Sequence, residues 1–183
     1  MRNKELIVFL AEGLEEIEAI TSIDILRRAG VDVTTVSLDN TKVHGSHEVD
    51  IIADEKLDNI VTEEYDGVVL PGGMPGSANL RDDKRVIKIL EKMYQKDKLI
   101  AAICAAPLAL IEAGVVKDGH FTIHHGMEDK IELNSTGDRI TVDNNIITAK
   151  GPGVAIEFGF NIVEKLIGTD KVKELNEGIY AKL

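Results

Sequence analysis

The chain has 183 residues and a formal net charge of −11 at pH 7. This length suits one domain, expected over residues 1–183, with enough interior for a full-sized core. An acidic surface repels phosphate backbones and anionic lipid headgroups, so we expect neither a nucleic acid nor a membrane as partner.

The sequence carries one cysteine, Cys104, so no disulfide can form within the chain, and this fits a reducing compartment. The first apolar run is short and follows Lys4 and Glu5, unlike a secretory signal. The longest apolar run, over 99–111, is shorter than the roughly 20 residues that a membrane-spanning helix needs. We therefore expect a cytoplasmic protein.

Apolar runs alternate with amphipathic stretches along the chain. In chain order we predict a strand over 6–10, a helix over 15–29, a strand over 31–38, a small hairpin over 43–53, a strand over 68–70, a helix over 82–96, a strand over 99–103, a helix over 105–113, two short strands within 139–149, and helices over 154–167 and 170–178. Strands this uniformly apolar need cover on both faces, which predicts a mostly parallel sheet between two helix layers.

The polar and glycine-rich features of the sequence follow predicted strands. Glu15 to Glu18 follow the predicted strand over 6–10, and Gly72 and Gly73 follow the strand over 68–70. Cys104 follows the strand over 99–103, and Gly151-Pro152-Gly153 follow the strands within 139–149. Ligands of an open parallel sheet bind beyond the carboxyl ends of its strands. These four segments are therefore expected to meet at one edge.

The segment around Cys104 has the pattern of a nucleophile elbow, in which a strand turns directly into a helix with the nucleophile at the apex. So tight a bend needs small residues two positions before and after the nucleophile, and these are Ala102 and Ala106. Pro107 falls in the first helical turn, where its missing N–H costs nothing. A thiol at a helix N-terminus faces unpaired N–H groups, so we expect its pKa to lie below the free value of roughly 8.5. The alternative is a small buried hydrophobic side chain.

Two further segments are candidates for the same site. Adjacent glycines at Gly72 and Gly73 allow close backbone approach, and with the N–H of Ala105 they would form an oxyanion hole, although a simple bend is the alternative. Glu18 lies close to the inward stripe of the first predicted helix. Facing inward without a cation, its carboxyl would be protonated. Favourable placement at the helix N-terminus is the alternative.

The histidines do not predict a metal site. His124 and His125 are neighbours on an extended segment and point in opposite directions, so at most one faces a given site. His44, His47 and His120 are expected at the surface. The sequence lacks the helical i, i+4 histidine pair of a metal site, so we expect neither a metal nor a cofactor.

Together these motifs make the sequence similar to the ThiJ/PfpI superfamily, and most of all to its branch with the parkinsonism-associated protein deglycase and bacterial relatives. The likeness covers nearly the whole chain. The segments that carry it are residues 11–18, 27–31, 69–73 and 101–107, and Gly151-Pro152-Gly153 with Glu157-Phe158.

The resemblance implies a flavodoxin-like three-layer sandwich and a homodimer. It implies that Cys104 is the reactive thiol, Glu18 the protonated carboxyl beside it and His124 the nearby imidazole. Gly73 and Ala105 would supply the oxyanion N–H groups, and Gly72 and Pro152 would line the substrate site.

The sequence also departs from the family pattern. A histidine directly follows the cysteine in the protease branch, whereas Ala105 stands here and argues against peptidase activity. His125 occupies a position where proline is common, so its role stays open. Lys150 stands where arginine is usual.

The resemblance implies a cofactor-independent cysteine enzyme acting on small α-oxoaldehydes, of glyoxalase or deglycase type, with a small carbonyl compound as substrate. Three alternatives remain open. One is an oxidative-stress sensor or holdase chaperone that uses the same oxidisable cysteine. Another is a cysteine hydrolase, weakened because no acidic residue is placed to orient His124. The third is a binding module with an inert buried cysteine.

Overall fold

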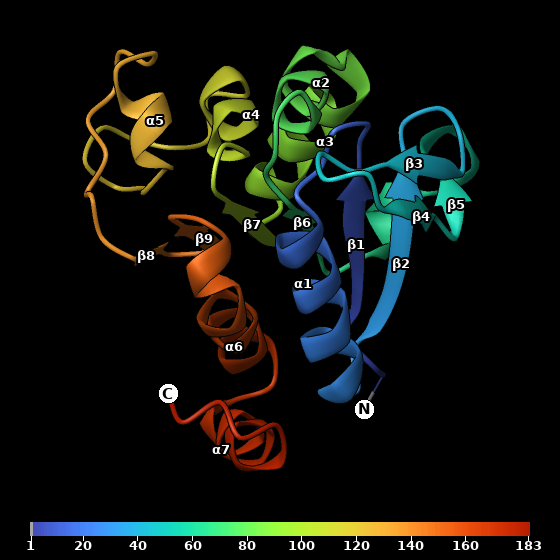
Figure 1. Cartoon of the computed structure of the whole chain (residues 1–183), viewed down its shortest axis with the longest axis vertical. Helices are drawn as coiled ribbons and strands as arrows, with labels where there is room; N and C mark the ends of the chain where they lie inside the picture. The colour runs from blue at the N-terminus through green and yellow to red at the C-terminus, as the bar shows by residue number, and fades with distance from the viewer. Residues whose placement is uncertain (1) are drawn as a thin grey trace.

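The computed structural model describes residues 2–183, which form a seven-stranded sheet and a separate two-stranded hairpin (Figure 1). The sheet runs in the order β5-β2-β1-β6-β7-β9-β8. Its strands are β1 (Glu5–Leu10), β2 (Asp32–Ser37), β5 (Glu55–Lys56), β6 (Gly67–Leu70), β7 (Leu99–Ile103), β8 (Ile140–Asp143) and β9 (Ile146–Ala149), and the hairpin pairs β3 (Lys42–His44) with β4 (Asp50–Ile52).

Helices follow most of these strands. They are α1 (Glu16–Arg28), α2 (Gly76–Asp82), α3 (Lys84–Gln95), α4 (Pro107–Glu112), α5 (His125–Glu128), α6 (Ala155–Leu166) and α7 (Thr169–Gly178). Within the described sheet every pair of neighbouring strands is parallel except β8 with β9. The order β2-β1-β6-β7-β9 reverses direction at β1, which is the doubly wound, flavodoxin-like arrangement that the family resemblance implies.

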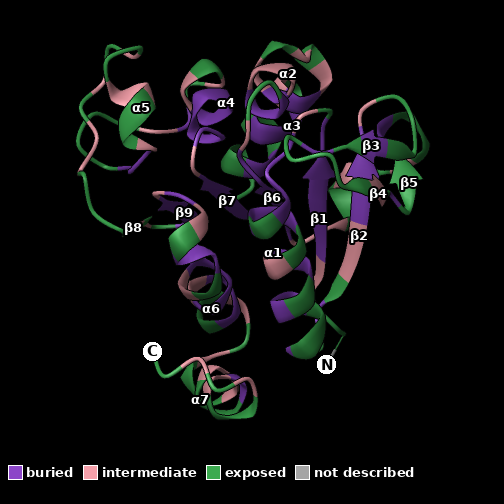
Figure 2. Ribbon diagram, in the orientation of Figure 1, coloured by how far each residue is buried: buried purple, intermediate pink, exposed green. Residues whose placement is uncertain are grey.

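Two apolar cores lie on opposite faces of the sheet, because successive strand side chains point to opposite sides. Leu6, Val8 and Leu10 of β1 pack with α1 and α6, whereas Ile7 and Phe9 pack with α2, α3 and α4. All five of these side chains are completely buried, and Figure 2 shows β6 and β7 as buried along their whole length and β1 as buried beyond its first residue. The prediction of strands covered on both faces is confirmed.

The boundaries differ from the predicted ones where the chain makes tight turns. Helix α4 begins at Pro107 rather than at Ala105, because residues 104–106 form the turn out of β7. The β8–β9 hairpin lacks glycine, and Asn144 supplies the left-handed residue with φ 53°. The short elements β5, α2 and α5 lack a long periodic pattern and are not predicted from the sequence.

Candidate active site

Four loops converge at the carboxyl edge of the sheet. Strands β1, β6, β7 and β9 are parallel neighbours, so their carboxyl ends lie side by side. The Cys104 N–H donates to the carbonyl of Ala149 at 2.8 Å, and the Glu15 N–H donates to the carbonyl of Gly72 at 2.9 Å. The convergence expected from strand order is therefore present.

Cys104 occupies the apex of the turn between β7 and α4. Its φ is 64°, a left-handed conformation that L-residues other than Gly, Asn and Asp rarely adopt. Ala102 and Ala106, the small residues on either side, are completely buried, and Pro107 lies in the first turn of α4. The backbone thus has the strained geometry of a nucleophile elbow, and the thiol is half-buried rather than sealed in the core.

Glu18 projects from the first turn of α1 into the protein and is completely buried. Its Oε2 accepts a hydrogen bond of 2.7 Å from the Gly72 N–H, whereas Oε1 is buried without a hydrogen-bond partner among the described residues. Burial, aided by the charge of Glu15, raises the pKa of this carboxyl to about 7 against the lowering effect of the Gly72 bond. Because its N–H already donates a hydrogen bond to Glu18, Gly72 positions the carboxyl and is not a free donor for an oxyanion.

The thiol pKa does not shift in the direction expected from the sequence. Burial, together with the neighbouring Glu18, raises the pKa of Cys104 to about 12, and hydrogen bonds from the N–H groups of Gly73 and Ala105 offset this rise only in part. Sequence reasoning counted the helix N-terminus but not the loss of solvent, and it took the Glu18 carboxyl beside the sulfur as protonated and therefore without charge. Since the pKa values of both groups are raised, the thiol and the carboxyl titrate as one pair that retains at least one proton near neutral pH.

His124 is joined to the elbow through the backbone, its N–H donating to the carbonyl of Cys104 at 2.8 Å. The ring is half-buried, and its Nδ1 accepts the Gly126 N–H at 3.1 Å, so the proton of the neutral ring lies on Nε2. Burial, with the charges of His125 and Lys150, lowers the pKa of His124. His125 is exposed and lies against it, with ring centroids 4.2 Å apart, so only one of the pair is directed inward.

The segment after β9 contributes Lys150 and two neighbours to this edge. An ideal Cβ on Gly151 would lie 3.5 Å from the His124 ring, and half-buried Pro152 begins a short 3₁₀ turn next to it. The Lys150 ammonium donates to the carbonyl of Gly137 at 2.9 Å. Its electrostatic effect on His124 was not foreseen, because the two residues are 26 positions apart and no local pattern connects them.

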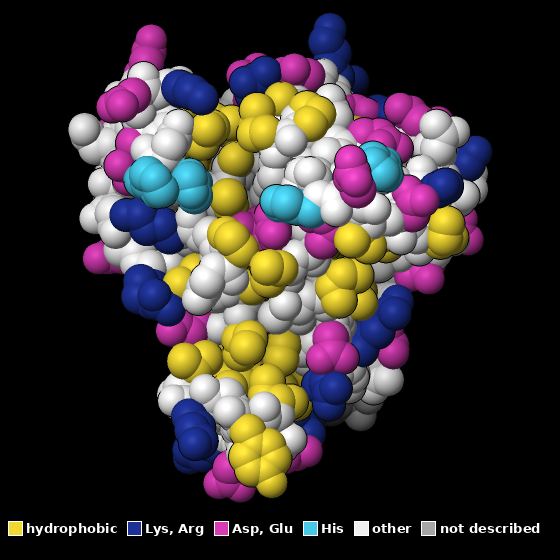
Figure 3. Space-filling view, in the orientation of Figure 1, with side chains coloured by type: hydrophobic (Ala, Val, Ile, Leu, Met, Phe, Trp, Pro, Cys, Tyr) yellow, Lys and Arg dark blue, Asp and Glu magenta, His cyan; other side chains and the backbone are white. Residues whose placement is uncertain are grey.

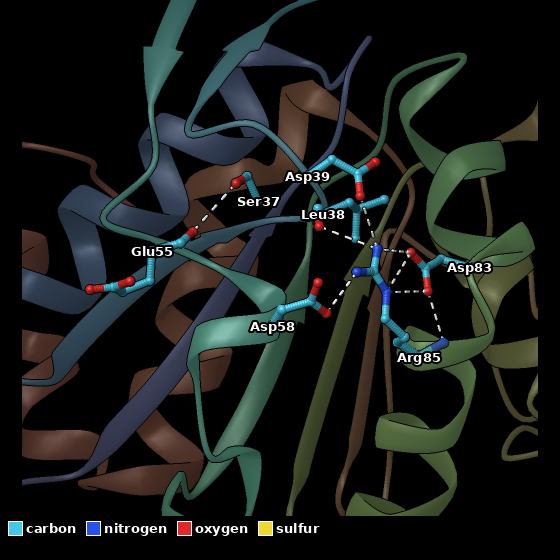
Figure 4. Close-up of polar contacts among 7 residues, drawn as sticks. All are labelled: Ser37, Leu38, Asp39, Glu55, Asp58, Asp83 and Arg85. Atoms are coloured by element: carbon cyan, nitrogen blue, oxygen red, sulfur yellow. Dashed lines mark hydrogen bonds and ion pairs between the residues drawn. The ribbon is translucent and has the colours of Figure 1, made fainter.

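A cavity of about 400 Å³ lies nearby, at the carboxyl ends of β1 and β2, but Cys104, Glu18 and His124 are not among its lining residues. Asp39 and Asp83 line this cavity, and the Arg85 guanidinium bonds both carboxylates and the carbonyl of Leu38 (Figure 4). Its acidic lining is thus partly neutralised by Arg85. The reactive groups lie instead around the elbow at the end of β7, which is two strands along the sheet from β1.

Comparison with known proteins identifies this arrangement. The family model described as DJ-1/PfpI matches residues 4–165. The chain belongs to the DJ-1/PfpI family. Protein dj-1beta of Drosophila melanogaster is 39% identical over 97% of both chains. The crystal structure of that fly protein superposes with a TM-score of 0.93 over 98% of each chain, at 37% identity.

Another member of the DJ-1/PfpI family carries an enzyme name. The protein named glutathione-independent glyoxalase DJR-1.2 of Caenorhabditis elegans is 32% identical, over 95% of this chain and 94% of the relative. The resemblance recognised in the sequence and its flavodoxin-like fold are both confirmed. None of the helices that the structure describes is long and apolar enough to cross a membrane.

Proposed function

We propose that this protein is a cofactor-independent enzyme that converts small α-oxoaldehydes such as methylglyoxal into hydroxy acids, with Cys104 as nucleophile. One observation carries the proposal. A cysteine with φ 64° at a strand–helix elbow receives backbone N–H groups from Gly73 and Ala105, beside the buried Glu18 carboxyl. The glyoxalase name of the nematode relative supports the same chemistry.

The reaction begins with proton placement in the Cys104–Glu18 pair. When the shared proton is on Glu18, the sulfur is a thiolate and adds to the aldehyde carbon of the substrate, forming a C–S bond. The aldehyde oxygen becomes an alkoxide next to the Gly73 and Ala105 N–H groups, which stabilise its charge before it is protonated to the hemithioacetal.

Proton transfer then turns the hemithioacetal into a thioester. A base removes the hydrogen from the former aldehyde carbon, and a proton is delivered to the neighbouring carbon. Glu18 and His124 are the groups that we assign to these transfers. Water finally cleaves the C–S bond of the thioester, so methylglyoxal and water give lactate and the thiol is regenerated. Electrons and atoms balance without an external oxidant or cofactor.

The test of this proposal is D-lactate or L-lactate formation from methylglyoxal by the wild-type protein and by Cys104→Ser. We expect the variant to lose at least about 100-fold in kcat/KM, because a serine hydroxyl is a far weaker acid and nucleophile than a thiol, even one whose pKa is raised. Glu177→Gln, a substitution on α7 outside the site, serves as control. Unchanged lactate formation by Cys104→Ser would end the proposal.

A second candidate function, oxidation sensing, is favoured by the unpartnered Oε1 of Glu18. Two equivalents of hydrogen peroxide would oxidise the thiolate first to a sulfenate and then to a sulfinate, each releasing one water, and a protonated Glu18 would donate a hydrogen bond to a sulfinate oxygen. Intact mass after mild peroxide treatment tests this candidate. Selective gain of two oxygens on Cys104 supports it, whereas random oxidation of methionines without modification of Cys104 argues against it.

The assembly and cellular setting also belong to the proposal. We propose a cytoplasmic homodimer that acts on small carbonyl compounds, and on glycation adducts through the same thiol. Exposed apolar side chains on α1, Ile17 and Ile20, support self-association. Figure 3 shows a broad band of hydrophobic side chains along the middle of this face. The single cysteine fits a reducing compartment.

A further inference from the structure

Glu15 connects the start of α1 to the loop that follows β6. Its N–H donates to the Gly72 carbonyl at 2.9 Å, the Gly72 N–H donates to Glu18 Oε2 at 2.7 Å, and the Glu18 N–H donates to Glu15 Oε2 at 2.8 Å. Together these hydrogen bonds close a ring. The Glu18 carboxyl is therefore held both at its backbone and at one of its oxygens.

The same ring fixes the carboxyl relative to the sulfur, because Gly72 lies between the two side chains. An ideal Cβ on Gly72 would lie 2.6 Å from both the Cys104 Cβ and Glu18 Oε2, so only glycine allows them to approach this closely. The Glu15 N–H bonds the carbonyl of this glycine. The cap of α1 and the geometry of the reactive pair thus depend on one another.

The Glu15 carboxylate also acts on the pair through its charge. Glu15 is 8% exposed and Glu18 is completely buried, so solvent screens the interaction between them only weakly. After burial, the charge of Glu15 is a cause that raises the pKa of Glu18, whereas the charge that raises the pKa of Cys104 is that of Glu18. Glu15 therefore acts on the carboxyl end of the pair.

Two other titratable groups lie near Glu15. Glu16 follows it in the chain, and His47 comes from the loop between β3 and β4. The hydrogen bond with Glu16, joined by the charges of Glu16 and Glu15, raises the pKa of His47, whose Nδ1 lies 2.8 Å from Glu16 Oε2. His47 is thus paired with Glu16, and the positive end of the α1 dipole favours an ionised Glu15. The charge of Glu15 remains available to act on Glu18.

We propose that Glu15 is a positioning residue of the Cys104–Glu18 pair, and that its charge keeps the shared proton on Glu18 and leaves the sulfur as a thiolate. This inference rests on the function proposed above, whose first step needs the thiolate. Moving the proton breaks the S–H bond and forms an O–H bond on Glu18, without another reactant. An ionised Glu18 would be a second negative charge next to Glu15, so Glu15 shifts the balance towards a neutral Glu18 and an ionised sulfur.

The experiment measures the rate at which iodoacetamide alkylates Cys104 near neutral pH. This rate reports the thiolate, needs no turnover, and is unambiguous because the sequence has one cysteine. Glu15→Gln should slow alkylation at least about fivefold, because it removes the charge that disfavours an ionised Glu18. Glu16→Gln is the matched control. It removes a charge from the same helical turn, but from a carboxylate bonded to His47, and should leave the rate nearly unchanged.

A double-mutant cycle separates proton placement from a merely structural role. In Glu18→Gln the side chain at this position cannot take the proton, so adding Glu15→Gln should no longer slow alkylation. A further pair of variants keeps the helix cap intact. Glu15→Asp and Glu15→Asn introduce favoured N-cap residues of the same size that differ in charge, so only Glu15→Asn should be slow. Circular dichroism checks every fold, and this pair decides if Glu15→Gln does not fold.

The inference is supported if alkylation is slow in Glu15→Gln and Glu15→Asn but not in Glu15→Asp, and only while Glu18 is present. Equal rates for wild type, Glu15→Gln and Glu15→Asn overturn it. So does equal slowing in Glu15→Asp and Glu15→Asn, slowing that persists in Glu18→Gln, or a wild-type Cys104 that is not alkylated. Lactate formation by Cys104→Ser judges the proposed function separately, so the failure of one is distinguished from the failure of the other.

Discussion

At the residue scale, the position of one buried proton sets the ionisation states of both Glu18 and Cys104. Burial disfavours the ionised form of each acid, and Glu18 raises the pKa of Cys104 further, whereas the hydrogen bond with Cys104 lowers the pKa of Glu18. The pair therefore exchanges one proton between oxygen and sulfur instead of holding two independent charges. Backbone N–H groups on both sides, from Gly72 to the carboxyl and from Gly73 and Ala105 to the sulfur, limit the cost of either arrangement.

Glu18→Gln is predicted to stabilise the fold at high pH. The folded-state pKa of Glu18, about 7, lies above the ordinary value of 4.5 for a glutamate side chain. The neutral carboxyl therefore favours folding fully below about pH 4.5, and this contribution is lost as pH rises through 7. Glutamine cannot ionise, so the variant should gain up to about 3 kcal/mol over wild type near pH 8 and about nothing near pH 4. Urea unfolding at both pH values measures the difference.

The control for this prediction is Glu16→Gln, which should shift stability in the opposite direction. Burial opposes ionisation of Glu16, but hydrogen bonds from His47 outweigh it and lower the pKa to about 2. Its ionised form therefore stabilises the fold above about pH 4.5, and this contribution is lost as pH falls through 2. Glu16→Gln should destabilise the protein near pH 8. If both variants change the free energy of unfolding in the same direction near pH 8, the prediction that the ionised Glu18 carboxylate destabilises the fold is wrong.

At the scale of elements, the ends of strands are tied to the helices that follow by side chains from distant segments. Asp83 caps α3 by accepting the Arg85 N–H at 2.8 Å, and the Arg85 guanidinium continues to the carbonyl of Leu38 beyond β2 and to Asp58 (Figure 4). One side chain thus fixes the first turn of α3 against the edge of the sheet. The elbow follows β7, the strand that comes directly after α3 in the chain.

Arg85→Ala is predicted to destabilise the protein by about 1–2 kcal/mol, because it leaves a half-buried Asp83 and a carbonyl without their donor. Arg81→Ala is the matched control. Arg81 bonds the exposed Asp82, its immediate neighbour, and an exposed pair of this kind contributes under about 1 kcal/mol. Thermal and urea unfolding of both variants gives the comparison. Equal losses would show that Arg85 does not connect these elements.

At the scale of the whole molecule, net charge and exposed apolar surface have opposite effects on the association of one chain with another. A net charge of −11 keeps chains apart, whereas an exposed apolar face favours association. Ile17 is 57% exposed although it lies one residue from the completely buried Glu18. An interface on this face of α1 would therefore lie directly behind the proposed catalytic carboxyl.

Ile17→Glu is predicted to convert the proposed homodimer into monomer, because it places a charge in an apolar contact. Light scattering after size-exclusion chromatography measures the mass. Val61→Glu adds the same charge at a residue that is equally exposed, 57%, but lies between β5 and β6. Loss of the dimer in both variants would point to net charge rather than to α1, and a monomeric wild type would contradict the dimer itself.

The sequence predicts the site most accurately where the chemistry is local. Small residues around Cys104 predict the elbow, and the structure shows it with a positive φ. Glu18 is buried as its place on the inward stripe of α1 indicates. The thiol pKa is the clear failure, because its direction depends on how much water the fold removes and on a carboxyl 86 positions earlier in the chain.

By itself the sequence determined the alternation of strands and helices, the parallel sheet and the edge at which its loops meet. Periodicity and strand order are properties of neighbouring residues, and they need no coordinates. Only the tertiary structure decided that Gly72 bonds Glu18 across 54 positions and that His47 reaches Glu16 across 31. Contacts of that span depend on how the layers pack, and burial, which sets the pKa of each acid, exists only once they have packed.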